Sequence, residues 1–123
     1  MVQLEQESLT WKIRGCVYDV YRELGHGFLE HVYQRALLIE FERHGIGAHS
    51  NVNMPVHYKG KPVGTFVADI VVEERVVLEL KAQRRLPLGP EAQLINYLKA
   101  SGKRVGLLIN FAFPKASVTR LVL

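Results

Sequence analysis

The sequence predicts an α/β fold in which three helices flank a mixed sheet of four or five strands. Helical and strand-like stretches follow one another in the order α-α-β-β-β-α-β-β along the 123 residues. The third helical stretch lies between two strongly apolar segments, residues 76–80 and 104–111. A helix that joins two strands of one sheet usually makes them parallel. We therefore expect these two strands to be parallel neighbours within the mixed sheet.

The N-terminal part of the chain predicts two amphipathic helices. Ser8 is a suitable N-cap for a first helix that runs to about Leu24 and ends at Gly25. Apolar residues recur there at helical spacing, and a second helix with the same pattern is expected over about 28–43. Cys16 is the single cysteine, which excludes an intrachain disulfide, and its apolar surroundings predict a small core residue.

The middle of the chain predicts three antiparallel strands. The first covers about 51–58, and Pro55 places it at a sheet edge or at a bulge because proline has no N–H for the ladder. The basic turn KGK leads into the second strand, 62–72, and the polar turn EER leads into the third, 76–80. Two apolar runs separated by a short polar turn are typical of a hairpin.

The last third of the chain predicts a helix followed by two strands. Pro90 suits the first position of a helix, which runs to about Ala100 and stops at Ser101 and Gly102. Residues 104–111 are almost continuously apolar, as expected of a strand buried on both faces. Residues 117–123 predict the final strand.

Length and composition predict a single domain over residues 1–123 that works in the cytoplasm. The chain has 48% hydrophobic and 23% charged residues, which are ordinary globular values. Its net charge of +4 is compatible with a nucleic-acid partner without demanding one. The start of the sequence has no apolar signal-peptide region, and no apolar run has the length needed to span a membrane.

Several other chemistries are unsupported. The sequence has no phosphate-binding G-x-x-x-x-G-K-S/T loop, no dinucleotide-binding G-x-G-x-x-G and no G-x-S-x-G elbow. These absences argue against nucleotide hydrolysis and serine-hydrolase chemistry. The five histidines show no paired ligand spacing, so a structural zinc site is a poor interpretation.

Charged residues interrupt the apolar central hairpin at three positions: Asp69, Glu79 and Lys81. Glu79 and Lys81 are two apart on a strand, so they point to the same face. If the turn holds three residues, Val72 pairs with Val76 and Asp69 lies opposite Glu79, with Cβ atoms about 5 Å apart. Two carboxylates that close repel one another unless a cation or a proton joins them.

A solvent-facing ion pair is the simpler interpretation of these charges, since surface charge pairs are frequent and weak. The apolar surroundings of Glu79 and Lys81 argue against it. Buried charges cost several kcal/mol unless they are paired or bound to a metal. The pattern therefore predicts a functional site of two carboxylates and a lysine, and it depends on the register of the hairpin.

These residues resemble a known family. Asp69, nine intervening residues and then Glu79-Leu80-Lys81 resemble the Asp…Glu-x-Lys signature of the PD-(D/E)XK nuclease superfamily. Residues 27–33 (GFLEHVY) are similar to the G-x-x-E-x-x-Y motif of the GxxExxY proteins, a branch of that superfamily. The resemblance extends from about residue 9 to residue 123. It implies a restriction-endonuclease-like core.

The resemblance implies a nuclease that hydrolyses phosphodiester bonds, in DNA above all, with Mg²⁺ or Mn²⁺ as cofactor. Asp69, Glu79 and the carbonyl of Leu80 would hold the metal, and oxygen ligands suit these hard ions. Lys81 would orient the attacking water and offset the charge of the transition state. Glu30, in the first turn of the second helix, is implied as a third carboxylate, although an acid there also simply favours the helix dipole.

Three further side chains are candidates for accessory roles. Tyr33 shares a helix face with Glu30, and either fixes its position or packs as ordinary core. Gln93 and Tyr97 lie one turn apart on the helix after the Glu-x-Lys strand. The resemblance implies that Gln93 touches the site or a substrate phosphate and that Tyr97 supports a backbone contact. The alternative is an amphipathic helix with an exposed Gln93 and a half-buried Tyr97.

Two rival functions stay open. One is a catalytically inactive domain of the same fold that binds nucleic acid or a protein, and the other is a partner protein that dimerises through a sheet edge. A homodimer is compatible with a nuclease, and a protein partner could supply specificity to so short a chain. Seven basic residues are candidates for a rim around the acidic centre: Arg84, Arg85, Lys99, Lys103, Arg104, Lys115 and Arg120.

Overall fold

The computed structural model describes residues 6–86 and 88–123 and confirms the predicted α/β architecture and element order. None of the three described helices combines the length and apolar character that crossing a membrane requires. The elements are α1 (Glu7–Leu24), α2 (Glu30–Arg43), β1 (Ala48–Tyr58), β2 (Lys61–Val72), β3 (Val76–Lys81), α3 (Pro90–Ser101), β4 (Val105–Phe111) and β5 (Ala116–Val122).

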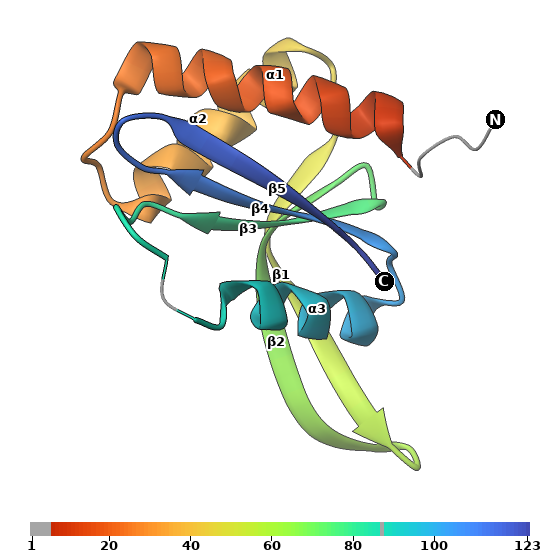
Figure 1. Ribbon diagram of the computed structural model, residues 1–123. Helices are drawn as coiled ribbons and strands as arrows, with labels where there is room; N and C mark the ends of the chain where they lie inside the picture. Colours follow the sequence, from red (N-terminus) through yellow and green to blue (C-terminus); the bar gives the residue numbers. More distant parts are fainter. Residues whose placement is uncertain (1–5, 87) are drawn as a thin grey trace, which may run out of the picture.

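The five strands form one sheet in the order β1-β2-β3-β4-β5. Strands β3 and β4 are parallel and joined by α3, as predicted, whereas the other neighbouring pairs are antiparallel. Helices α1 and α2 cover one face of the sheet, and α3 lies on the opposite face (Figure 1). The chain therefore folds into three layers.

Two apolar clusters fill the spaces between these layers. The larger lies under α1 and α2 and includes Cys16, Leu37 and Phe41, so Cys16 is the core residue predicted. The smaller lies under α3 and includes Leu94. All of β4 is buried, as the continuous apolar run predicted. A Cβ added to Gly106 would lie 2.8 Å from Cδ1 of Leu94, so the absence of a side chain lets α3 pack closely on β4.

The β1–β2 hairpin extends beyond the rest of the sheet (Figure 1). Its outer strand, β1, is a sheet edge, and the pairing shifts register between Val56 and His57. Pro55 therefore lies both at an edge and beside a bulge. Strand β2 pairs with β3 over only three residues, 70–72. Among the described residues, the rest of β2 pairs with β1 alone.

Three boundaries differ from the predictions by two or more residues, and the others agree to within one residue. Helix α1 begins at Glu7 with Gln6 as N-cap, so Ser8 is inside the helix and is not its cap. Helix α2 begins at Glu30, later than predicted, because its N-cap Leu29 is extended. Strand β1 begins at Ala48, earlier than predicted, because the start of β1 pairs with the end of β2.

Candidate active site

The turn between β2 and β3 sets the register on which the site depends. The β2–β3 ladder starts at Val72↔Val76, as a three-residue turn requires. It ends after three residue pairs, so Asp69 and Glu79, which would form the next pair, are not part of it. Beyond it, the N–H of Leu80 donates to Oδ2 of Asp69 at 2.7 Å. A carboxylate thus takes the place of a backbone carbonyl where the two strands separate, and the bond holds this carboxylate against β3.

Glu79 is the buried acid of the site. It is only 4% exposed, its Oε1 lies 3.6 Å from Nζ of Lys81, and its Oε2 is buried without a hydrogen-bond partner. Burial, and then the nearby carboxylate of Asp69, raise the pKa of Glu79 to about 7, although Lys81 opposes the shift. An unpaired buried oxygen next to a second carboxylate is an arrangement that a cation would stabilise.

Asp69 is only partly buried. Burial raises its pKa, while the hydrogen bond from Leu80 and the charge of Lys81 act in the opposite direction. The N–H of Leu80 and the ammonium of Lys81 therefore favour the ionised form of Asp69, and the side chain of Glu79 adds a smaller effect in the same direction.

Tyr33 anchors the loop that leads into α2. Its side chain is fully buried, and its ring stacks on Phe111 with centroids 4.3 Å apart and planes 5° apart. Its hydroxyl donates to the carbonyl of Gly25 at 2.7 Å and accepts from the N–H of Phe28 at 3.2 Å. Glu30 is the first residue of α2, so these contacts fix the backbone immediately before it.

Glu30 itself is exposed, and its charge is the smallest of the influences that raise the pKa of Glu79. Within the described residues, one group of three side chains has its potential ligand atoms all within 4.8 Å of one another, and it does not contain Glu30. The charge of Glu30 therefore reaches Glu79, but the ligand atoms of Glu30, Asp69 and Glu79 do not all lie within 4.8 Å of one another.

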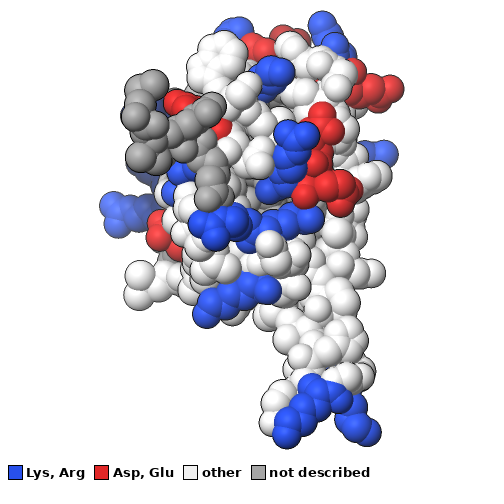
Figure 2. Space-filling view, turned by 90° about the vertical axis from the view of Figure 1, so that its right-hand side faces the viewer, with Lys and Arg blue, Asp and Glu red and all other residues white. Residues whose placement is uncertain are grey.

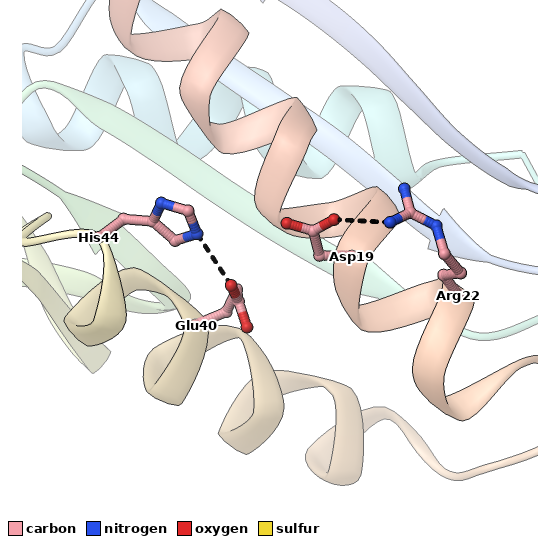
Figure 3. A network of polar contacts seen from close by, with 4 residues as sticks. All are labelled: Asp19, Arg22, Glu40 and His44. Carbon is pink, nitrogen blue, oxygen red and sulfur yellow. Dashed lines mark hydrogen bonds and ion pairs between the residues drawn. The ribbon is translucent and has the colours of Figure 1, made fainter.

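The group that does meet this distance lies between α1 and α2 and consists of Asp19, Glu40 and His44 (Figure 3). Nε2 of His44 lies 2.8 Å from Oε2 of Glu40, and Arg22 lies 3.1 Å from Asp19. Asp19 is thus paired with Arg22 on α1, and Glu40 contacts His44 at the C-cap of α2. These pairs account for the group, which shares no element with Asp69 and Glu79.

Tyr97 and Gln93 lie on α3. Tyr97 is 4% exposed, which corrects the half-buried alternative, because its ring packs edge-on against Phe66 with centroids 5.6 Å apart. Burial, followed by the charges of Glu79 and Asp69, raises the pKa of Tyr97 to about 12. The ring therefore lies close to both carboxylates. Gln93 is exposed, one turn earlier on the helix.

Two residues that the sequence analysis did not single out hold the backbone around the site. Gln34 donates from Nε2 to the carbonyl of Asp69 at 2.9 Å and to Oδ1 of Asn51 at 3.1 Å. Asn110 binds both backbone groups of Gln83, at 3.0 and 2.8 Å, just after β3. Gln34 follows Glu30 by one helical turn, and Asn110 is the one uncharged polar side chain in its apolar strand. These positions in the sequence could have marked both residues as candidates.

The predicted basic rim is wrong for part of its members, because β3 and β4 are parallel. Lys81 pairs with Asn110 at one end of the two strands, and Val76 pairs with Val105 at the other. Residues 103 and 104 precede Val105, so they lie at the end away from Lys81. Figure 2 shows this far end, where acidic side chains lie among the basic ones. Three of the seven lie in loops at the Lys81 end: Arg84, Arg85 and Lys115.

Replacing Tyr33 with phenylalanine is expected to lower the free energy of unfolding by about 1–2 kcal/mol, because the carbonyl of Gly25 and the N–H of Phe28 lose their hydrogen bonds to the hydroxyl while the stacking on Phe111 remains. Urea unfolding measures this, and the amide of Phe28 should exchange with solvent faster. Tyr18→Phe is the control, because Tyr18 is 42% exposed. Equal effects of the two substitutions would contradict an anchoring role of the Tyr33 hydroxyl.

Comparisons with known proteins agree with this architecture. The family model described as the PD-(D/E)XK nuclease superfamily matches residues 7–121. A search of curated proteins found no match. The crystal structure of SSO0001 has a TM-score of 0.60 at 21% identity, over 95% of this chain and 59% of that one. An alkaline exonuclease (LHK-Exo) from Laribacter hongkongensis has a TM-score of 0.54 at 9% identity, over 98% of this chain and 72% of that one. At these identities the solved structures show similarity of fold.

Proposed function

The chain belongs to the PD-(D/E)XK nuclease superfamily, and from this membership we propose that it is a metal-dependent nuclease that hydrolyses phosphodiester bonds, above all in DNA. One observation carries the proposal. Oε2 of the buried Glu79 has no hydrogen-bond partner, although Asp69 and Lys81 lie beside this carboxylate. A structural ion pair has no need of an unpaired buried oxygen, whereas a metal site does.

The residues present fit a hard divalent cation. Asp69, Glu79 and the carbonyl of Leu80 are the oxygen donors we assign to Mg²⁺ or Mn²⁺, ions that need only one or two carboxylates from a protein. Because Glu30 is exposed and further away, its proposed contribution is through a water molecule. Such an ion, when bound, polarises the phosphoryl group and lowers the pKa of coordinated water.

The remaining side chains supply positioning and charge. Lys81 orients the attacking water and stabilises the negative charge that develops on the phosphoryl oxygens. Gln93, exposed on α3, contacts a substrate phosphate or that water. Tyr97 supports the contact with the backbone of the nucleic acid. Tyr33 acts as a positioning residue, because it holds the loop that precedes Glu30.

We also propose that the chain belongs to the GxxExxY branch of the superfamily. The contacts of Tyr33 support this assignment, because they join the tyrosine of the motif to the loop at its glycine end. The proposed partner is nucleic acid. A homodimer and a protein partner that supplies specificity stay predictions, and gel filtration of the purified protein tests the first.

The test is cleavage of labelled duplex, branched and single-stranded DNA and of RNA, with Mg²⁺, Mn²⁺ or EDTA. Wild type is expected to cut only with metal, and Lys81→Met to be slower by about 10²–10³-fold because it loses transition-state stabilisation. Lys12→Met is the control, since Lys12 is exposed on α1. Cleavage in EDTA, or equal rates for Lys81→Met and wild type, would overturn the proposal. Metal binding without cleavage would favour the inactive binding domain.

A further inference from the structure

The outer half of the β1–β2 hairpin has no role in the core. Residues 55–65, which we call the arm, are all exposed except for the half-buried Val56. The arm stands clear of the helices and of the other strands (Figure 1). A two-stranded ribbon that packs on nothing gains little stability. Its length therefore needs another explanation, such as a partner.

The arm has the chemistry of a polyanion-binding surface. Its sequence, PVHYKGKPVGT, contains His57, Lys59 and Lys61 and no acidic residue. Figure 2 shows the end of the arm with basic side chains and no acidic ones on the visible face. Tyr58 and Val63 beside the lysines are each 63% exposed, and Nζ of Lys59 lies 5.3 Å from the centroid of the Tyr58 ring. Lysines that flank exposed aromatic and aliphatic groups suit a nucleic-acid groove, where phosphates line the rims and thymine methyl groups offer apolar contacts between them.

From these observations we propose that the arm binds in the major groove of duplex DNA, with Lys59 and Lys61 on phosphates. A two-stranded β-ribbon fits the major groove of B-form DNA, whereas the major groove of A-form RNA is too narrow for side chains to read. The proposal rests on the proposed nuclease function only for the statement that the same duplex also occupies the active site.

The geometry of β2 is consistent with one duplex at both places. Lys61 and Asp69 lie eight positions apart on this strand. At about 3.3 Å per residue the strand spans roughly 26 Å between them. Phosphates of one DNA strand are about 3.4 Å apart along the axis, so this span covers roughly seven or eight base pairs. The arm would then hold the duplex on one side of the bond that is cut.

The test is binding of a labelled 30-base-pair DNA duplex in EDTA, where a metal-dependent nuclease does not cut, measured by fluorescence anisotropy at several salt concentrations. The double variant Lys59→Gln/Lys61→Gln is expected to bind about tenfold or more weakly at 100 mM salt, and its salt slope should be smaller by about 2, because two phosphate contacts are lost. The control is Lys12→Gln/Arg43→Gln, which removes the same charge from exposed positions on α1 and α2.

Several results would overturn the proposal. They are absence of duplex binding by wild type, equal losses in the two double variants, or tighter binding of duplex RNA than of DNA. Gel filtration adds another, because dissociation of a wild-type dimer by the arm substitutions would make the arm an interface between copies. Arm-dependent binding without any cleavage would refute only the nuclease function. Cleavage together with binding that does not depend on the arm would refute only the proposed role of the arm in binding DNA.

Discussion

Asp69→Asn is expected to reduce metal-dependent cleavage by about 10³-fold and to leave the fold intact, because the substitution removes the negative charge of Asp69 and keeps its hydrogen bond. Oδ2 accepts the N–H of Leu80 at 2.7 Å. An asparagine oxygen accepts the same hydrogen bond, so the join between β2 and β3 survives the substitution. The negative charge that would hold a divalent cation does not survive it.

Asp69→Ala is the matched variant that separates the two tasks of Asp69, its charge and its hydrogen bond. It removes the charge and also leaves the N–H of Leu80, whose residue is 1% exposed, without its acceptor. We expect the same loss of activity and, in addition, a free energy of unfolding lower by about 1–3 kcal/mol. Initial cleavage rates and urea unfolding measure the two effects. An active Asp69→Asn variant, or one as unstable as Asp69→Ala, would contradict this division of tasks.

Glu79→Gln is expected to abolish cleavage while making the metal-free protein more stable above neutral pH. The pKa of Glu79 is raised from 4.5 to about 7 in the folded protein, first by burial and then by Asp69. Between these values the folded state binds more protons than the unfolded state, so the free energy of unfolding falls as the pH rises. The contribution is on the order of 2–3 kcal/mol, fully present below pH 4.5 and lost above about pH 7.

The measurement is urea unfolding in EDTA at pH 5 and pH 8, comparing wild type with Glu79→Gln. The wild type should lose more stability between the two pH values, and Glu91→Gln, at an exposed position of α3, should behave like wild type. Mn²⁺ at pH 8 should then stabilise wild type more than Glu79→Gln, because an ion that binds only the folded state raises its stability. An identical pH dependence in wild type and Glu79→Gln would show that the pKa of Glu79 is not raised in the folded protein.

The sequence by itself determined the order of the elements, and it reduced the register of the central hairpin to a question of turn length. Amphipathic periods, Pro90 and the glycines at helix ends are local signals, and so is a turn of three residues between two apolar runs. The parallel pair followed from a helix between two strands, and the edge position of β1 followed from Pro55. Such features depend on residues close together in the chain, which is why pattern and spacing were enough.

Only the tertiary structure decided how the candidate site is held and which charges surround it. The hydrogen bond from Leu80 to Asp69 depends on where the strands separate, and the bond from Gln34 joins residues 35 positions apart. The burial of Tyr97 depends on α3 packing beside Phe66, and Lys103 lies at the far end because β4 runs parallel to β3. These contacts join segments distant in the chain, so their partners are set by packing between layers. The local sequence pattern can mark a polar residue such as Gln34, but it does not identify the residue that it contacts.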